Sequence, residues 1–269
     1  FFILIPAGHI WKFVTLAYIP PTIAGIVLAY RRKYLLGGII TALFIALQIR
    51  SNHIQMSYYF MFVILFIIGA YFEEAYKKKE LTHFFKASAI LALAAMVGVC
   101  INLSNLYHTY EYSKETMRGK SELKQEGNAA NQTSSGLDRD YITNWSYGIG
   151  ETLTLLVPNV KGGASSDNLS QSEAAMEKAN PMYSSIYSQF PQYFGDQPWT
   201  AGPVYVGAFV MFLFVLGCFI VKGPLKWALL GATIFSVLLS WGKNFMGLTD
   251  FFIDYVPMYN KFRAVSSIL

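Results

Sequence analysis

The sequence predicts an all-α membrane protein, a polytopic bundle of transmembrane helices that carries a long, largely irregular extracytoplasmic loop region. Five or six apolar stretches along the 269 residues are each about as long as a bilayer is thick. Basic residues gather in every second connection between these stretches. Apolar residues make up 54% of the chain and charged residues only 14%, whereas soluble domains carry about 25% charged residues.

The apolar stretches form two groups, about four in residues 1–103 and about two in residues 203–269, on either side of a polar segment, 104–202. In order, they cover residues 13–30, 34–49, 55–72, 87–103, 203–221 and 227–241. A membrane helix needs roughly 20 apolar residues, so each stretch fits or falls slightly short. Short connections predict that the first four helices pack as antiparallel neighbours. Pro20 and Pro21 predict a kink in the first.

The charges of the connections predict which side of the membrane each one faces. One set of connections carries nine basic residues against three acids, and the basic residues are Arg31, Arg32, Lys33, Lys77, Lys78, Lys79, Lys86, Lys222 and Lys226. Lys and Arg are retained in the cytoplasm, so this set is predicted to be cytoplasmic. Residues 104–202 and the region after Trp241 are then extracytoplasmic. We expect a multi-pass protein of the bacterial cytoplasmic membrane.

Segment 104–202 differs in kind from the rest of the chain. It is rich in Ser, Asn, Gly and Tyr, and it carries eleven acids and seven bases. Charges at helical spacing over 107–124 predict an extension of the fourth helix, and 127–136 is typical of a flexible tip. The amphipathic run 145–157 predicts a short helix on the membrane surface. Long loops of this kind are usually functional or disordered, and we favour a functional loop.

Composition and chain ends exclude several classes. The net charge of +5 is concentrated in the short loops, so nucleic acid is not an expected partner, whereas membrane lipids are. Cys100 and Cys218 lie in predicted helices and are expected to be packing residues rather than a disulfide. The chain opens at Phe1 without Met or a signal-peptide pattern, and a new apolar run begins at its end. We therefore expect a fragment of a larger protein.

Polar residues gather where the predicted helices emerge on the outer face. Those proposed to bind the phosphate of a lipid donor are His9, Lys12, His53, Lys243 and Arg263. Cationic side chains at a lipid interface suit a phosphate, although basic residues there can also simply reach into the headgroups. For Arg263, a structural pair with Asp250 or Asp254 is the alternative. No tight metal-binding spacing occurs, so no metal site is predicted, although His9, His53 and Asp250 could form one and a divalent cation stays open as a cofactor.

Two of the outer acids are poorly explained as ordinary surface charges. Glu151 lies in an otherwise apolar run, and Asp196 lies in YFGDQPW just before a predicted membrane helix. A carboxylate can deprotonate or hold a hydroxyl group, so both are candidate catalytic residues. No GxSxG, P-loop or GxGxxG pattern supports a soluble hydrolase, an NTPase or a dehydrogenase.

Long strings spread over the chain resemble the bacterial YfhO family of membrane proteins. They are AGH at 7–9, RKYLLGGIITALFIALQI at 32–49, NHIQMSYY at 52–59, TYEYSKETMRGKSEL at 109–123, WSYGIGETLTLLVPNVKGG at 145–163, YFGDQPWTAGPVYVGA at 193–208 and WGKNFMGLTDFFIDYVPMYNKFRAVSSIL at 241–269. The resemblance covers essentially the whole chain.

The YfhO family is grouped with the GT-C glycosyltransferases, so the resemblance implies an integral membrane enzyme. Such enzymes transfer a sugar, with inversion, from a polyprenyl-phosphate carrier to a glycan or lipid acceptor on the outer side of the membrane. Their best-known acidic motif lies in the first outer loop, which would precede residue 1 here. The alternatives are a transporter or flippase of lipid-linked sugars, and a non-catalytic envelope assembly protein. A transporter should carry polar residues at mid-membrane depth. Residues 34–49 and 203–221 contain no charge, which favours transfer at one face.

Overall fold

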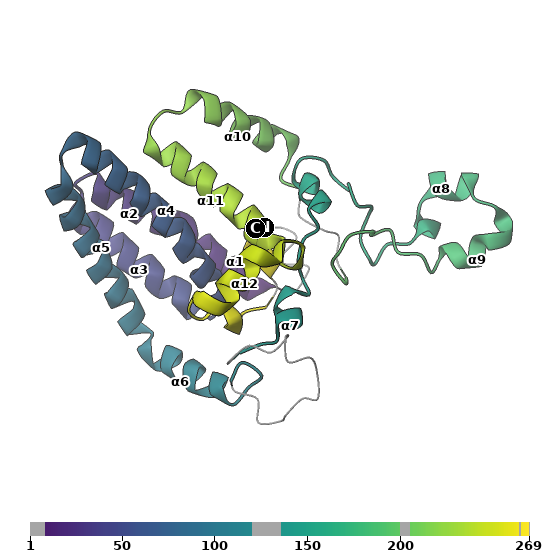
Figure 1. The fold of residues 1–269 in the computed structure, drawn as a ribbon, viewed down its shortest axis with the longest axis horizontal. Helices are drawn as coiled ribbons and strands as arrows, with labels where there is room; N and C mark the ends of the chain where they lie inside the picture. The colour runs from purple at the N-terminus through teal and green to yellow at the C-terminus, as the bar shows by residue number, and fades with distance from the viewer. Residues whose placement is uncertain (1–8, 120–135, 200–204, 264, 269) are drawn as a thin grey trace. The chain divides into compact units, whose positions relative to one another are not determined.

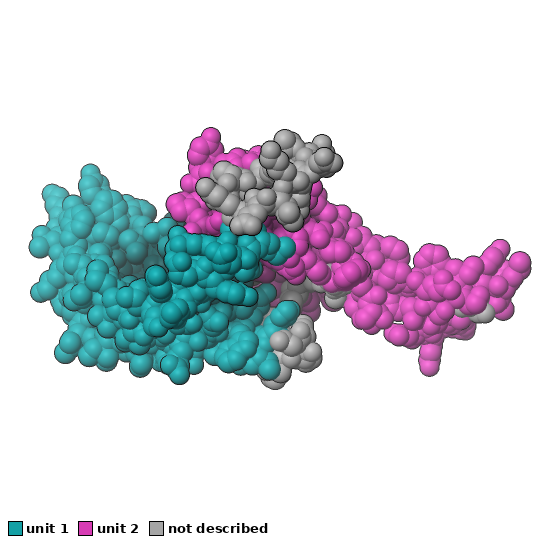
Figure 2. Space-filling view, turned by 90° about the horizontal axis from the view of Figure 1, so that it is seen from below, with its two compact units in different colours: residues 1–119, 221–234 teal, residues 120–220, 235–269 magenta. Residues whose placement is uncertain are grey.

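The structure is a computed structural model that describes residues 9–119, 136–199, 205–263 and 265–268. Every element named within these ranges is a helix, and two isolated bridges, 162 to 193 and 168 to 191, are their only strand-like pairings. The predicted all-α class is therefore confirmed for the described residues. The chain divides into two compact units, coloured separately in Figure 2. Unit 1 comprises residues 1–119 and 221–234, and unit 2 comprises residues 120–220 and 235–269.

Unit 1 is built from long apolar helices that run side by side (Figure 1). They are α1 (Ile10–Ala17), α2 (Ile19–Tyr30), α3 (Tyr34–Arg50), α4 (Ile54–Lys78) and α5 (Leu81–Ile101), followed by α6 (Leu103–Lys114). Three stretches are long and apolar enough to cross a membrane: Ile10–Tyr30, Ile54–Lys78 and Leu81–Ile101. Helix α3 is apolar but shorter. The four predicted helices thus form close to their predicted positions, and α6 continues the fourth beyond Asn102.

Unit 2 contains shorter helices joined by irregular chain. The α-helices are α7 (Arg139–Thr143), α8 (Glu173–Lys178), α9 (Ser184–Tyr187), α10 (Ala208–Ile220) and α12 (Met246–Tyr255), and the 3-10 helices include Gly150–Leu155 and Gly242–Phe245. Helix α11 (Pro224–Ser240) and the helix Gly242–Tyr255 would be a fourth candidate span, but they meet at 108°. The predicted stretch 203–221 is represented by the short α10. Of the predicted tip 127–136, only Gly136 lies within the described residues.

Two features of unit 1 follow directly from its sequence. Pro20 and Pro21 lie in the first turn of α2, where a missing backbone N–H costs nothing, and the break from α1 falls at Tyr18. Helices α2 and α3 approach each other through Gly25 and Gly37. A Cβ atom on Gly37 would lie 2.5 Å from the backbone nitrogen of Ala29, so only glycine fits there.

Candidate functional site

The centre of the candidate site is Glu151, whose side chain is fully buried in the first turn of the 3-10 helix Gly150–Leu155. The surrounding run reverses the usual pattern of a water-soluble helix. Its large apolar side chains are exposed, at Ile149, Leu153, Leu156 and Val157, while Glu151 and Thr154 are buried. Large apolar side chains exposed so close together in the chain are typical of a surface that contacts a membrane or a partner.

Both oxygens of the Glu151 carboxylate accept hydrogen bonds from the protein. The backbone N–H of Gly148 donates to Oε2 at 2.6 Å, and the Tyr193 hydroxyl donates to Oε1. The Tyr193 hydroxyl oxygen itself accepts from the backbone N–H of Gln197 at 3.1 Å. Such pairing is what makes a buried carboxylate tolerable. Glu151 therefore links the backbone at Gly148 to the side chain of Tyr193.

Two phenols next to Glu151 are held in their neutral form. Burial, and then the hydrogen bond to Glu151, raise the pKa of Tyr193 well above its ordinary value. Burial, followed by the negative charge of Glu151, raises the pKa of Tyr147 to about 12. Both hydroxyl groups are thus protonated at neutral pH, and Tyr193 acts as a hydrogen-bond donor.

The second predicted acid, Asp196, lies beside Glu151. A Cβ atom placed on Gly148 would lie 2.4 Å from Oδ2 of Asp196 and 3.2 Å from Oε2 of Glu151. One placed on Gly195 would lie 1.8 Å from Oε1 of Glu151. The two carboxylates thus converge on one point, and the glycines at 148 and 195 are the residues that let the backbone approach them so closely.

Asp196 differs from Glu151 because its side chain is exposed. The Asn244 amide donates to its Oδ2 at 3.3 Å and also to the backbone oxygen of Tyr147 at 2.9 Å. Lys243 donates from Nζ to the backbone oxygen of Asp196 at 3.0 Å. Residues distant in sequence therefore place an accessible carboxylate and an exposed ammonium group side by side. Of the two acids, Asp196 can touch a substrate, whereas Glu151 positions the chain around it.

A cavity of about 530 Å³ lies next to the acids within unit 2, and Tyr193 lines it. Its wall is mainly polar and includes Asp167, Asn168, Gln189 and the exposed ring of Trp199. The isolated bridges from 162 to 193 and from 168 to 191 hold the two sides of this cavity together. Hydroxyl-rich ligands suit such a wall because amides and carboxylates bind their hydroxyl groups while aromatic rings cover their apolar faces.

The other cationic candidates are distributed between the two units. In unit 1, burial and then the charges of Lys12 and His9 lower the pKa of the His53 ring. These three predicted residues therefore lie near one another. The Nδ1 atom of His53 is buried, and no residue in the described ranges forms a hydrogen bond with it. In unit 2, the Arg263 guanidinium donates to the Tyr141 hydroxyl at 2.5 Å and lies over its ring.

The two acids considered as alternative partners of Arg263, Asp250 and Asp254, form ion pairs with Arg139. Its guanidinium binds the carboxylates of both Asp250 and Asp254, the latter at 2.5 Å. Arg139 is largely buried, with 19% of its side chain exposed, so this fork is a structural link between α7 and α12.

The environment of His53 predicts how stability depends on pH. Burial first, and then the charge of Lys12, lower the pKa of His53 below its ordinary value of 6.5. Protonation therefore favours the unfolded chain, and stability should fall as the pH drops below 6.5 toward the lower folded pKa. Thermal unfolding in detergent between pH 8 and pH 5 measures this fall. We expect His53→Gln to reduce it and His108→Gln, which changes an exposed histidine, to leave it as in the wild type.

Sequence reasoning missed several residues of the site. Tyr193, Tyr147 and Asn244 all contact an acid or its backbone, yet none was selected. Tyr193 stands three residues before Asp196 in the same YFGDQPW string, which was the available signal. The parts of the chain that the structure describes contain no group of three or more His, Cys, Asp or Glu side chains that could hold a metal ion.

Comparisons with known proteins assign neither a family nor a function to this site. No protein-family model matches the chain, and searches among curated proteins and among solved structures find no match.

Proposed function

We propose that this chain is part of a GT-C-type membrane glycosyltransferase that resembles the YfhO family. In this proposal it transfers a sugar from a polyprenyl-phosphate carrier to a glycan or lipid acceptor. One observation carries the proposal most: the exposed carboxylate of Asp196, fixed beside the buried Glu151 and next to a polar cavity with an exposed tryptophan. The candidate membrane spans of unit 1 support it, as does the resemblance of the long strings to the family.

The proposed sugar transfer gives one role to Asp196 and one to Lys243. In the transfer, the bond between the anomeric carbon and the carrier phosphate breaks while a bond to the acceptor hydroxyl oxygen forms, and the hydroxyl proton leaves. The resemblance implies that this proton passes to a principal catalytic carboxylate in the first outer loop of such enzymes. Asp196 then holds a hydroxyl group of the sugar or acceptor through a charge-assisted hydrogen bond. Lys243 beside it stabilises negative charge on the departing phosphate.

We place this site on the outer side of a bacterial cytoplasmic membrane, with residues 104–202 extracytoplasmic. The alternation of basic connections supports this orientation. The exposed apolar face of residues 149–157 would rest on the bilayer and bring the site to the depth of the carrier phosphate. A membrane-impermeant thiol reagent applied to intact cells should label Gln189→Cys. Labelling only after permeabilisation would reverse the orientation.

A flippase of lipid-linked sugars is the alternative function, and the fate of the sugar separates the two. The full-length protein would be reconstituted in liposomes with a labelled polyprenyl-phosphate sugar and an acceptor glycan. A transferase moves the label onto the acceptor, whereas a flippase leaves it on the carrier and changes only its leaflet. An assembly protein would do neither. The acceptor-bound label is the result expected from our proposal.

A further inference from the structure

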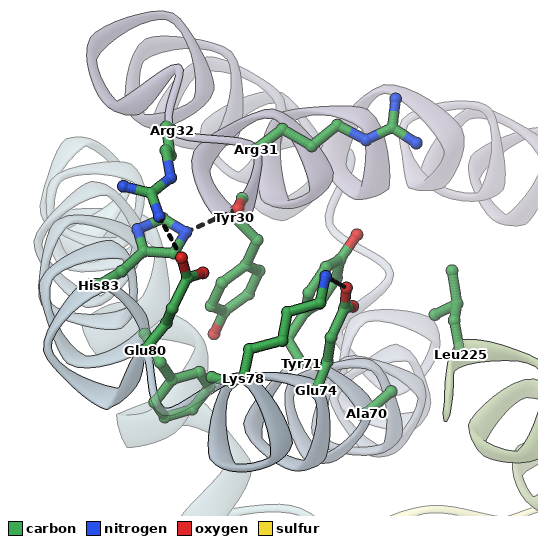
Figure 3. A pocket seen from close by; sticks show the side chains of 12 residues that line it. Tyr30, Arg31, Arg32, Ala70, Tyr71, Glu74, Lys78, Glu80, His83 and Leu225 are labelled. Atoms are coloured by element: carbon green, nitrogen blue, oxygen red, sulfur yellow. Dashed lines mark hydrogen bonds and ion pairs between the residues drawn. The ribbon is translucent and has the colours of Figure 1, made fainter. Parts of the chain in front are cut away.

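A second cavity, of about 500 Å³, lies in unit 1 at the end of α2 and between the neighbouring ends of α4 and α5 (Figure 3). Helix α2 ends at Tyr30, α4 ends at Lys78 and α5 begins at Leu81, so the cavity lies at one end of all three candidate membrane spans. Neither the acid pair nor its neighbours belong to it. This cavity is therefore a separate feature from the proposed transfer site.

Two tight turns form the polar rim of the cavity. Arg32 and Lys79 have left-handed backbone angles, with φ of 67° and 56°, and they end the turns after α2 and α4. Arg32 reaches from its turn to donate to Glu80 at 2.7 Å, and Lys78 donates to Glu74 at 2.5 Å. Each carboxylate of the rim is thus matched by one cation.

Arg31 is the cation that remains. It is exposed, lines the cavity and takes part in no ion pair among the residues that the structure describes. Figure 3 shows its guanidinium extending away from the Arg32–Glu80 pair, along the opposite side of the pocket. The rim accordingly has an excess of positive charge, and its unmatched member has the planar fork that suits phosphate.

The inner wall of the cavity is apolar and firmly built. Tyr30 stacks on Tyr71 with ring centroids 4.3 Å apart and on Phe84 at 5.6 Å. His83 also fixes the backbone of Tyr30, because its Nε2 donates to the Tyr30 backbone oxygen at 2.8 Å. Leu225 completes the wall. A cavity with a cationic rim and an apolar wall, at the end of membrane spans, matches an amphiphile better than a soluble anion.

We propose that this cavity binds the headgroup phosphate of an anionic phospholipid, with Arg31 as its main contact and Arg32 and Lys78 beside it. The lipid chain would continue along the apolar wall toward the hydrocarbon core. This binding is independent of the sugar transfer proposed for unit 2. Because hydrogen bonds to charged groups are strong, we expect the affinity for the lipid to fall roughly tenfold to hundredfold when Arg31 loses its charge.

Binding of phosphatidylglycerol and phosphatidylcholine to the purified full-length protein tests the proposal, for example by native mass spectrometry from detergent. Arg31→Gln is compared with Lys33→Gln, because each removes one positive charge from the same turn and Lys33 does not line the cavity. We expect the wild type to prefer phosphatidylglycerol, Arg31→Gln to lose about tenfold or more in affinity, and Lys33→Gln to change little. Arg31→Lys, which keeps the charge without the fork, should fall between them.

Three results would overturn the inference. Equal losses in Arg31→Gln and Lys33→Gln would mean that general surface charge attracts the lipid. Equal binding of phosphatidylglycerol and phosphatidylcholine would remove the anion site. Inorganic phosphate or glycerol 3-phosphate that displaces phosphatidylglycerol at equal concentration would show that the site takes a soluble anion instead.

Discussion

Asp196→Asn is expected to lower kcat/KM for sugar transfer about tenfold to a hundredfold while leaving the stability of the protein nearly unchanged. The carboxylate is exposed, so its replacement by an amide of the same shape leaves no buried group unpaired. What is lost is the charge-assisted hydrogen bond to a substrate hydroxyl. Initial rates with a labelled polyprenyl-phosphate sugar, together with the unfolding temperature, measure both quantities.

Glu177→Gln is the matched control, because it neutralises another exposed acid of unit 2, on α8. Its transfer rate should equal that of the wild type. Glu151→Gln provides the contrast. An amide cannot accept from both Gly148 and Tyr193 in the way that the carboxylate does, so this variant should lose stability first. Wild-type rates in Asp196→Asn would show that Asp196 touches no substrate.

Gly37→Ala is expected to lower the free energy of unfolding by roughly 3 kcal/mol, near the upper end of the usual cost of overpacking. The added methyl group would lie 2.5 Å from the Ala29 nitrogen and 2.7 Å from the Gly25 oxygen. Both are backbone atoms of α2, so no side chain can rotate away, and the two helices must separate.

Gly69→Ala is the control for this change, because no other described part of the chain, beyond the nearby backbone of α4 and the two neighbouring residues, comes within 4 Å of the position of its added methyl group. It places alanine in the middle of α4, where alanine favours the helix over glycine. We expect a stability equal to the wild type or slightly higher. Unfolding by denaturing detergent in mixed micelles compares the two variants, and an equal loss in both would argue against the close approach of α2 and α3.

The helices of unit 1 could be predicted because long apolar runs bounded by basic turns leave few alternatives. The stretch predicted at 13–30 is the helix pair Ile10–Ala17 and Ile19–Tyr30, and the prolines account for the break. Prediction was weaker after residue 202. There α10 begins only after Gly207, which has a φ of 106°, and the chain turns by 108° between α11 and the following helix. These bends depend on local backbone conformations that hydropathy does not record.

For the site, sequence reasoning could select Glu151 and Asp196 because each is an acid in unexpected surroundings. It could not show that they meet, because the irregular chain between them has no periodicity to fix its path. It also could not separate their roles, since burial distinguishes Glu151 from Asp196 only once the chain is folded. Tyr193 was missed because the chain contains 18 tyrosines, and only its place in the same YFGDQPW string as Asp196 distinguishes this one.

The most direct test of the central claim is a single-turnover measurement with the donor bound to the full-length protein. Labelled polyprenyl-phosphate sugar is bound at saturation, acceptor is added, and the label on each is followed with time. Our account predicts that the wild type moves the sugar to the acceptor with inversion, and that Asp196→Asn binds the donor but transfers it much more slowly. Label that stays on the carrier in the wild type, or transfer at the wild-type rate in Asp196→Asn, would contradict the account.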